Sequence, residues 1–232
     1  MNKYTILIML MFVALSASGC LKPQEITPAS IPDTVLNRLK WEQVGEPEIN
    51  NQLVNISEKM NVGVNIITTK FHAANSENKM NTQISDFNTG LGTNNAAEFI
   101  VVRIGLPAKV KLPSTFMDKI IEQQLSTTIA NEQEQNIEIT PENTTTLQVT
   151  KPDGTTANAN VYSMNIGNLS FKVIVISWGS DGINTIAIAV YPAGSIKMDV
   201  PTSDGDMENI DILKFDETKV QDEILELIKN IR

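Results

Sequence analysis

The clearest pattern in the chain is an alternation of apolar and polar residues in its C-terminal half. From Thr144 onward this alternation has a period of two residues, which is typical of half-buried β-strands. Turn sequences that contain Gly, Asp or Asn interrupt it at residues 151–154, 167–168 and 181–182. The predicted strands cover residues 144–150, 155–166, 171–178 and 183–191. Four consecutive strands joined by short turns predict an antiparallel meander.

Three further strand patterns precede the meander. The first, Trp41–Ile49, contains Pro47, which favours a position at the edge of a sheet. In the second, apolar residues alternate with polar or small ones from Val62 to His72. The third, Ala96–Ile104, is apolar on both faces, and we therefore expect it near the centre of the sheet. Residues 73–95 are rich in Asn, Ser, Thr and Gly, and they predict a long loop.

Helical spacing of apolar residues occurs in two longer segments, and a shorter helix is predicted over Thr34–Lys40 with Asp33 as its N-cap. Ser114 is the expected N-cap of a helix that reaches about Asn131, and Asp216 or Thr218 the expected N-cap of a C-terminal helix. Their apolar stripes are Met117, Ile120, Ile121, Leu125 and Ile129, and Val220, Ile224, Leu227, Ile228 and Ile231. The acidic stretch before the last helix, Pro192 to Asp216, is predicted to be a loop.

These elements predict a single α+β domain. A buried stripe on each of two amphipathic helices requires a sheet to pack on. The order of elements, with single strands before the first of these helices and a four-strand meander before the second, predicts that this sheet is largely antiparallel.

The first twenty residues have the pattern of a secretory signal peptide. Lys3 precedes a dense apolar run, Ile6 to Ala17, which is shorter than the roughly 20 residues that a membrane-spanning helix needs. Small residues then lead to Cys20, the only cysteine, which therefore cannot form an internal disulfide. This junction resembles the lipobox of prokaryotic lipoproteins, although Ala17 stands where Leu is usual.

We therefore interpret residues 1–19 as a signal peptide and Cys20 as a lipidation site that attaches the protein to the membrane. The alternatives are a retained N-terminal anchor and a cleavage that leaves a free thiol. Residues 20–32 contain three prolines and are expected to form a semi-extended tether. Residues 33–232 then form one extracytoplasmic domain on the outer face of the cell membrane.

Composition excludes one class of partner. The formal net charge is −9, from 18 Lys and Arg against 27 Asp and Glu, and no basic patch is present. Binding to a nucleic-acid backbone has no electrostatic source here, so we expect no nucleic-acid partner.

Candidate chemistry is sparse. His72 is the only histidine and Cys20 is assigned to the anchor, so no Cys–His pair is available and no motif indicates a Ser–His pair. We interpret His72 as a polar surface residue. The acidic residues Asp204, Asp206, Glu208 and Asp211 do not fit the spacing of a calcium-binding EF-hand. We expect no catalytic residue of these kinds, no metal site and no cofactor, which leaves two converging carboxylates as the remaining route to catalysis.

Three sites match the N-glycosylation pattern Asn-x-Ser/Thr, and export would make them accessible to modification. They begin at Asn55, Asn143 and Asn168, of which Asn143 lies in a predicted loop.

Several short motifs resemble, in the same order, those of an archaeal lipoprotein family of unknown function that is common in haloarchaea and also present in methanogens. They are Ser18-Gly19-Cys20, Ile31-Pro32-Asp33-Thr34-Val35-Leu36, Ala97-Glu98-Phe99-Ile100-Val101-Val102 and Ile186-Ala187-Ile188-Ala189-Val190-Tyr191-Pro192. The resemblance implies a secreted, lipid-tethered domain, and it brings no catalytic residues. The order of elements is also similar to the fold shared by Mog1 and the photosystem protein PsbP.

Three functional hypotheses follow. The first is a non-catalytic surface domain that binds a protein partner of the cell envelope. The second is a membrane-tethered receptor for a small ligand, with residues 73–95 as a lid. The third is a carboxylate-dependent hydrolase. The missing catalytic residues favour the first hypothesis.

Overall fold

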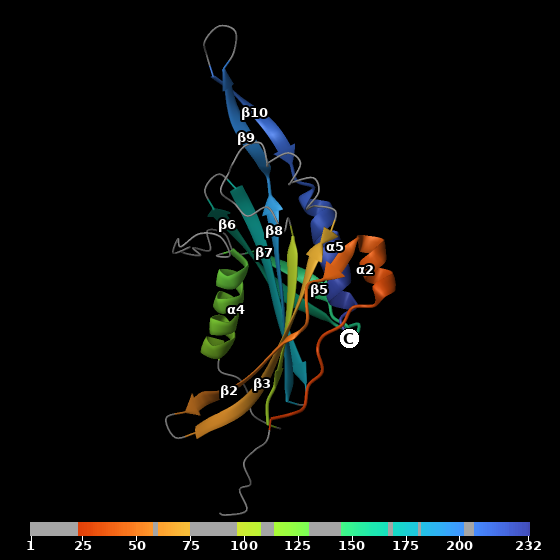
Figure 1. The fold of residues 1–232 in the computed structure, drawn as a ribbon, viewed down its shortest axis with the longest axis vertical. Coiled ribbons are helices and arrows are strands. Elements are labelled where there is room, and N and C mark those ends of the chain that lie inside the picture. Colours follow the sequence, from red (N-terminus) through yellow and green to blue (C-terminus); the bar gives the residue numbers. More distant parts are fainter. Residues whose placement is uncertain are drawn as a thin grey trace, which may run out of the picture.

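The computed structural model describes residues 23–57, 60–74, 97–107, 114–129, 145–166, 169–180, 182–201 and 207–232. Within these ranges the chain forms ten strands and three helices (Figure 1). The helices are α2 (Asp33–Leu39), α4 (Ser114–Ile129) and α5 (Glu217–Lys229). The strands are β1 (Trp41–Gln43), β2 (Glu48–Ser57), β3 (Met60–Ala73), β4 (Glu98–Gly105), β5 (Thr145–Thr150), β6 (Thr156–Ile166), β7 (Leu169–Ser180), β8 (Ile183–Ala193), β9 (Ser195–Pro201) and β10 (Met207–Lys214).

Eight strands form one antiparallel sheet in the order β1-β3-β4-β8-β7-β6-β5, and β2 pairs with β3 beside β1. The meander β5 to β8 occupies one half of this sheet, as the sequence predicts. Strand β4 lies between β3 and β8, and its central residues are buried on both faces, which confirms the predicted central strand. The α+β single-domain prediction is also confirmed.

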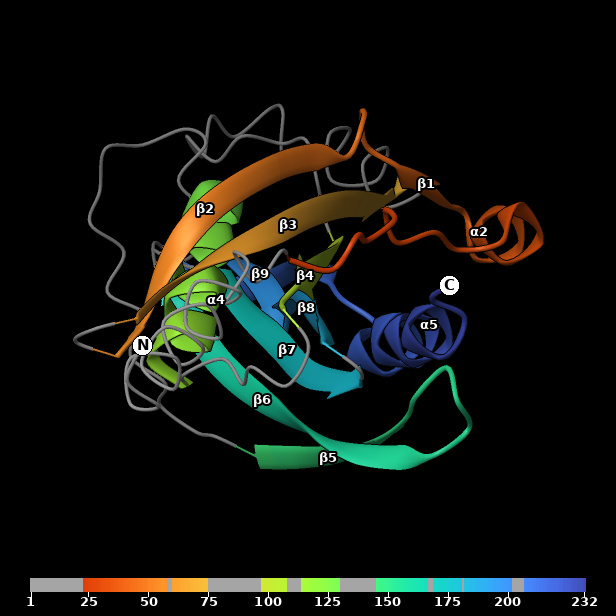
Figure 2. The same cartoon turned by 90° about the horizontal axis from the view of Figure 1, so that it is seen from below.

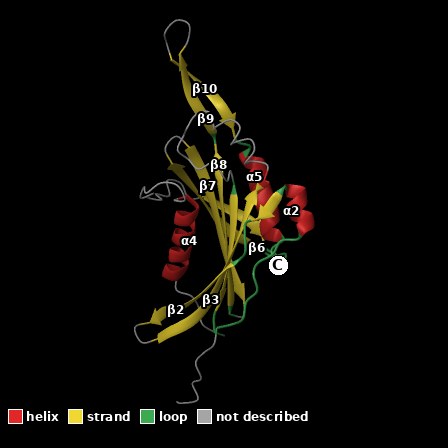
Figure 3. Ribbon diagram, in the orientation of Figure 1, coloured by secondary structure: helices red, strands yellow, loops and turns green. Residues whose placement is uncertain are grey.

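Helices cover both faces of the sheet (Figure 3). Helix α4 lies on one face, and α2 and α5 lie on the other (Figure 2). Two hydrophobic clusters correspond to these two faces. The α5 side contains Phe71, Phe99, Ile174 and Leu227, and the α4 side contains Ile100, Ile120 and Ile188, among others.

The central strands are therefore apolar at successive positions rather than at alternate ones. In β8, Ile186, Ile188 and Val190 belong to the α4 side, and Ala187, Ala189 and Tyr191 belong to the α5 side. On the face that α5 covers, the two alanines pack in one cluster with larger side chains such as Tyr191 and Phe99.

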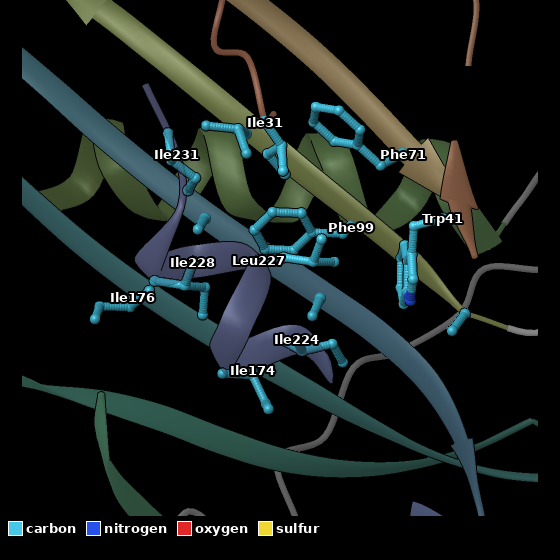
Figure 4. Close-up of a cluster of buried hydrophobic side chains, with 14 of the residues drawn as sticks. Ile31, Trp41, Phe71, Phe99, Ile174, Ile176, Ile224, Leu227, Ile228 and Ile231 are labelled. Atoms are coloured by element: carbon cyan, nitrogen blue, oxygen red, sulfur yellow. The ribbon is translucent and has the colours of Figure 1, made fainter. Parts of the chain in front are cut away.

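Both predicted helical stripes are buried or half-buried where the structure describes their side chains. In α4, Ile120 is buried, and Met117 and Ile121 pack against the same cluster. In α5, Ile224, Leu227 and Ile228 are buried and point toward Phe99 and the strands beneath (Figure 4). Asp216 is the N-cap of α5, since its side chain accepts a hydrogen bond from the backbone N–H of Lys219. Asp33, by contrast, is the first residue of α2, and the N-cap Pro32 makes no side-chain cap hydrogen bond.

Two predictions, one of a loop and one of a strand, need correction. The acidic stretch predicted as a loop contains the antiparallel hairpin β9–β10, which lies at one end of the long axis (Figure 1). The single strand predicted at 41–49 is two strands, β1 and β2, separated by a turn in which Gly45 has φ of 64° and Pro47 follows. Both strands lie at the edge of the sheet, as the proline indicated.

The segment before α2 is part of the domain. Residues 23–32, expected to be a tether, pack against the sheet, with Ala29 and Ile31 buried. The backbone N–H of Gln24 donates to Leu106 O at 3.2 Å, and Ser30 and Arg232 exchange two backbone hydrogen bonds of 3.1 and 2.8 Å. The domain therefore begins no later than Pro23, ten residues before the expected boundary at Asp33.

Candidate functional site

Strand β5 forms the open edge of the sheet opposite to β1 and β2. Within the described part of the chain it pairs only with β6. Local hydrogen bonds stabilise the turn between β5 and β6. Asp153 Oδ1 accepts one from the backbone N–H of Thr155 at 2.9 Å and one from Thr155 Oγ1 at 2.7 Å. Gly154 supplies the positive φ of 80° that such a turn requires.

Strand β5 lacks the features that usually protect an edge strand. Its six residues, Thr-Thr-Leu-Gln-Val-Thr, include no charged residue and no proline, and its register with β6 runs without a bulge. Natural proteins commonly protect an open edge by these means, because its outward-facing N–H and C=O groups are a template for another strand. The outer edge of β5 is therefore suited to pairing with a further extended segment.

Helix α5 provides the second wall of the candidate site. The helix packs against the sheet through Ile224, Leu227 and Ile228. The residues that follow Ile224 and Ile228 in the sequence lie on the side of the helix that faces β5. A groove of about 470 Å³ results. We call it the β5–α5 groove, and it is lined by Gln148, Val149, Thr150, Leu225, Glu226, Lys229 and Asn230.

Charged, polar and apolar residues all line the groove. Val149 is buried and Leu225 is half-buried, while Lys229 is exposed. Arg38 Nη1 donates to Glu226 Oε2 at 3.0 Å, and this hydrogen bond and the guanidinium charge hold the pKa of Glu226 below its usual range. The negative charge of Glu226 is thus paired with Arg38, and Lys229 adds a positive charge to the wall.

A side-chain hydrogen bond stabilises the last turn of α5, which lies beside the groove. Asn230 Nδ2 donates to the backbone carbonyl of Glu226 at 2.8 Å, which satisfies one of the carbonyl groups that the last turn of a helix leaves without a partner. The last turn of α5 and the edge of β5 therefore lie side by side along the groove.

Most residues singled out from the sequence lie elsewhere. Residues 1–19, Cys20, Asn143 and Asn168 lie outside the described residues, as does nearly all of the 73–95 segment. Asn55 is in β2 and pairs with Asn61 of β3. Modification of these asparagines and of Cys20 remains a prediction.

The titratable residues considered for chemistry do not meet in the groove. His72 Nε2 lies within hydrogen-bond distance of Glu42 Oε1, 2.5 Å away, and the two residues pair between β3 and β1. Glu208 and Asp211 belong to β10, whereas Asp204 and Asp206 are not described. Among described residues, no three His, Cys, Asp or Glu side chains are grouped as metal ligands. The groove has one carboxylate, Glu226.

Sequence reasoning missed the groove residues. Nothing in the local pattern distinguishes Gln148 or Lys229 from other exposed positions. The absence of charge in residues 145–150 was the available signal, but the open edge follows from the strand order, which depends on long-range pairing.

No protein family, curated protein or solved structure matches this chain. In the described residues no helix has the length and apolar character needed to cross a membrane.

Proposed function

We propose that the protein is a lipid-anchored domain on the extracytoplasmic face of the cell membrane, and that it binds an extended segment of an envelope protein in the β5–α5 groove. The observation that carries the proposal is the open, uncharged edge of β5 beside a groove walled by α5. An extended peptide between an edge strand and a helix is a recurrent mode of recognition. The main chain supplies affinity, and alternate side chains enter the groove.

The groove chemistry indicates the kind of segment. Backbone N–H and C=O groups of β5 would pair with the peptide main chain. The half-buried Leu225 offers an apolar contact, and Gln148 and Thr150 also line the groove. Because Glu226 is paired with Arg38 while Lys229 extends from the wall, we expect a peptide that carries an acidic side chain.

The anchor rests on the sequence. The short apolar run, the small residues before Cys20 and the single cysteine support lipidation. A lipid-tethered domain is confined to the membrane surface, which raises the effective concentration of an envelope partner.

Native mass spectrometry of the protein, gently extracted from its own membrane, tests both the lipid anchor and the protein partner. Support requires a lipid mass on Cys20 and a co-released protein. A chain that carries only a small bound mass would instead support the receptor hypothesis, since 470 Å³ lies within the range of small-ligand sites.

A charge reversal in the groove tests whether the peptide binds there. A synthetic peptide from the co-released protein should bind the Lys229→Glu variant on the order of tenfold more weakly, which is about 1.4 kcal/mol. Lys219→Glu is the matched control, because Lys219 is an exposed lysine in the first turn of the same helix. Equal weakening in both variants, or in neither, would place the peptide outside the groove.

A further inference from the structure

The largest exposed aliphatic side chains of the described residues lie on strand β2. Ile49 is 69% exposed and Leu53 is 77% exposed. They are four residues apart, so they lie on the same face of the strand, about 13 Å apart. Their pairing partners across the ladder are Ile67 and Gly63 of β3, which point to the same face.

The N-terminal segment runs over this same face of the neighbouring strand. A Cβ at Gly63 would lie 3.7 Å from Cδ of Pro23, and Asn65 Nδ2 donates to Gln24 O at 3.1 Å. A Cβ at Gly105, the partner of Asn65 on β4, would lie 2.3 Å from Gln24 O, so this position requires a glycine. The chain thus enters the domain beside Gly63, opposite Leu53.

Covalent geometry limits how far this entry point can be from Cys20. Two residues lie between Cys20 and Pro23, and the three Cα–Cα steps from Cys20 to Pro23 span at most about 11 Å when fully extended. A lipid on Cys20 would place that residue at the membrane interface, so Pro23 and Gly63 must lie close to the headgroups. Leu53 is one strand further, about 5 Å from Gly63.

The arrangement of the molecule agrees with such a position. The β2–β3 ribbon lies at the opposite end of the long axis from the β9–β10 hairpin (Figure 1). The only charged residue within Glu48–Leu53 is Glu48, which is paired with Lys70 at 2.9 Å. A strand with two exposed aliphatic side chains and no charged residue between them is suited to a lipid interface.

We propose that the face of β2 that bears Ile49 and Leu53 rests on the lipid surface to which Cys20 attaches the domain. The inference rests on the anchor in the proposed function, and it adds the orientation. The β9–β10 hairpin then points away from the membrane, and the β5–α5 groove remains accessible from the side.

The test uses the full, lipidated chain in phosphatidylcholine vesicles. Leu53→Cys introduces a thiol for an environment-sensitive fluorophore, and lipidation of Cys20 leaves this thiol as the only one to react. Thr218→Cys, an exposed position in the first turn of α5 next to β10, is the matched control. We expect the Leu53 probe to emit at shorter wavelength and to be quenched by headgroup-labelled lipid, whereas the Thr218 probe behaves as in water.

Two results would overturn the inference, and they differ. A chain that carries lipid and floats with the vesicles, but whose Leu53 probe behaves like the Thr218 probe, refutes the orientation alone. A chain without lipid mass on Cys20 that does not float refutes the anchor, and the orientation with it. The intact mass is therefore measured before labelling.

Discussion

Tyr191 shows how the environment of one residue depends on both faces of the sheet. It is fully buried on β8 beneath α5, and its hydroxyl donates a long hydrogen bond of 3.4 Å to Gln221 Oε1. Burial, together with the negative charge of Glu217, raises the pKa of Tyr191 to about 12. The period-two pattern predicts the strand and its Ile186, Ile188 and Val190 face, but the burial of Tyr191 depends on a helix that is distant in sequence.

This shift predicts a loss of stability at high pH. The unfolded chain releases the tyrosine proton near pH 10, while the folded chain retains it to about pH 12. The free energy of unfolding is therefore unaffected by Tyr191 below pH 10, and it falls by roughly 3 kcal/mol as the pH rises from 10 to 12. Urea denaturation at pH 8, 10, 11 and 12 measures this loss.

The Tyr191→Phe variant should show a shallower fall over the same interval. Its own cost, from the lost hydrogen bond, appears already at pH 8 and is roughly 1 kcal/mol. Because every other titrating group is common to both proteins, the difference between the two pH profiles isolates Tyr191. Parallel profiles above pH 10 would contradict the prediction.

At the scale of elements, local rules predicted the helices better than the segments between strands. The stripes of α4 and α5 and the Asp216 cap depend on neighbours three or four residues away, so the sequence contains the whole signal. In the β9 segment, Ile196, Met198 and Val200 alternate with polar residues, but the acidic composition of the stretch led to its interpretation as a loop. Alternation, not acidity, predicts a strand.

The cap of α5 offers a direct test at this scale. Asp216 Oδ1 accepts from the backbone N–H of Lys219 at 3.1 Å, and Glu217 adds an acidic residue to the first turn. Asp216→Ala should lower the free energy of unfolding by about 1 kcal/mol, because the N–H then loses its partner. Asp216→Asn, which retains the acceptor oxygen, should stay within about 0.5 kcal/mol of the original protein. Equal losses in the two variants, measured by denaturant unfolding, would show that the side chain does not cap the helix.

At the scale of the whole molecule, the sequence did not predict contacts between distant segments. The strand order that leaves β5 at an edge, and therefore the β5–α5 groove, arises from pairings such as β4 with β8. The packing of the N-terminal segment against the domain also depends on contacts between distant residues. Its prolines suggested a tether, yet Arg103 Nη1 donates to Thr27 O at 3.2 Å and the C-terminal residue pairs with Ser30. Contacts across such sequence separations leave no periodic pattern in the segment itself.

Shortening the chain tests whether residues 23–32 belong to the domain. Two soluble chains are compared, one that begins at Leu21 and one that begins at Asp33. The shorter chain loses the burial of Ile31 and Ala29 and the hydrogen bonds to Gln24 and Ser30. Since ordering the segment offsets part of these gains, we expect a net loss of roughly 2–4 kcal/mol. Thermal unfolding of a domain of this size should then occur about 5–15 °C lower. Equal melting temperatures would restore the tether interpretation, and they would also remove the constraint that brings β2 to the membrane, because a loose segment would allow the domain to turn freely on its anchor.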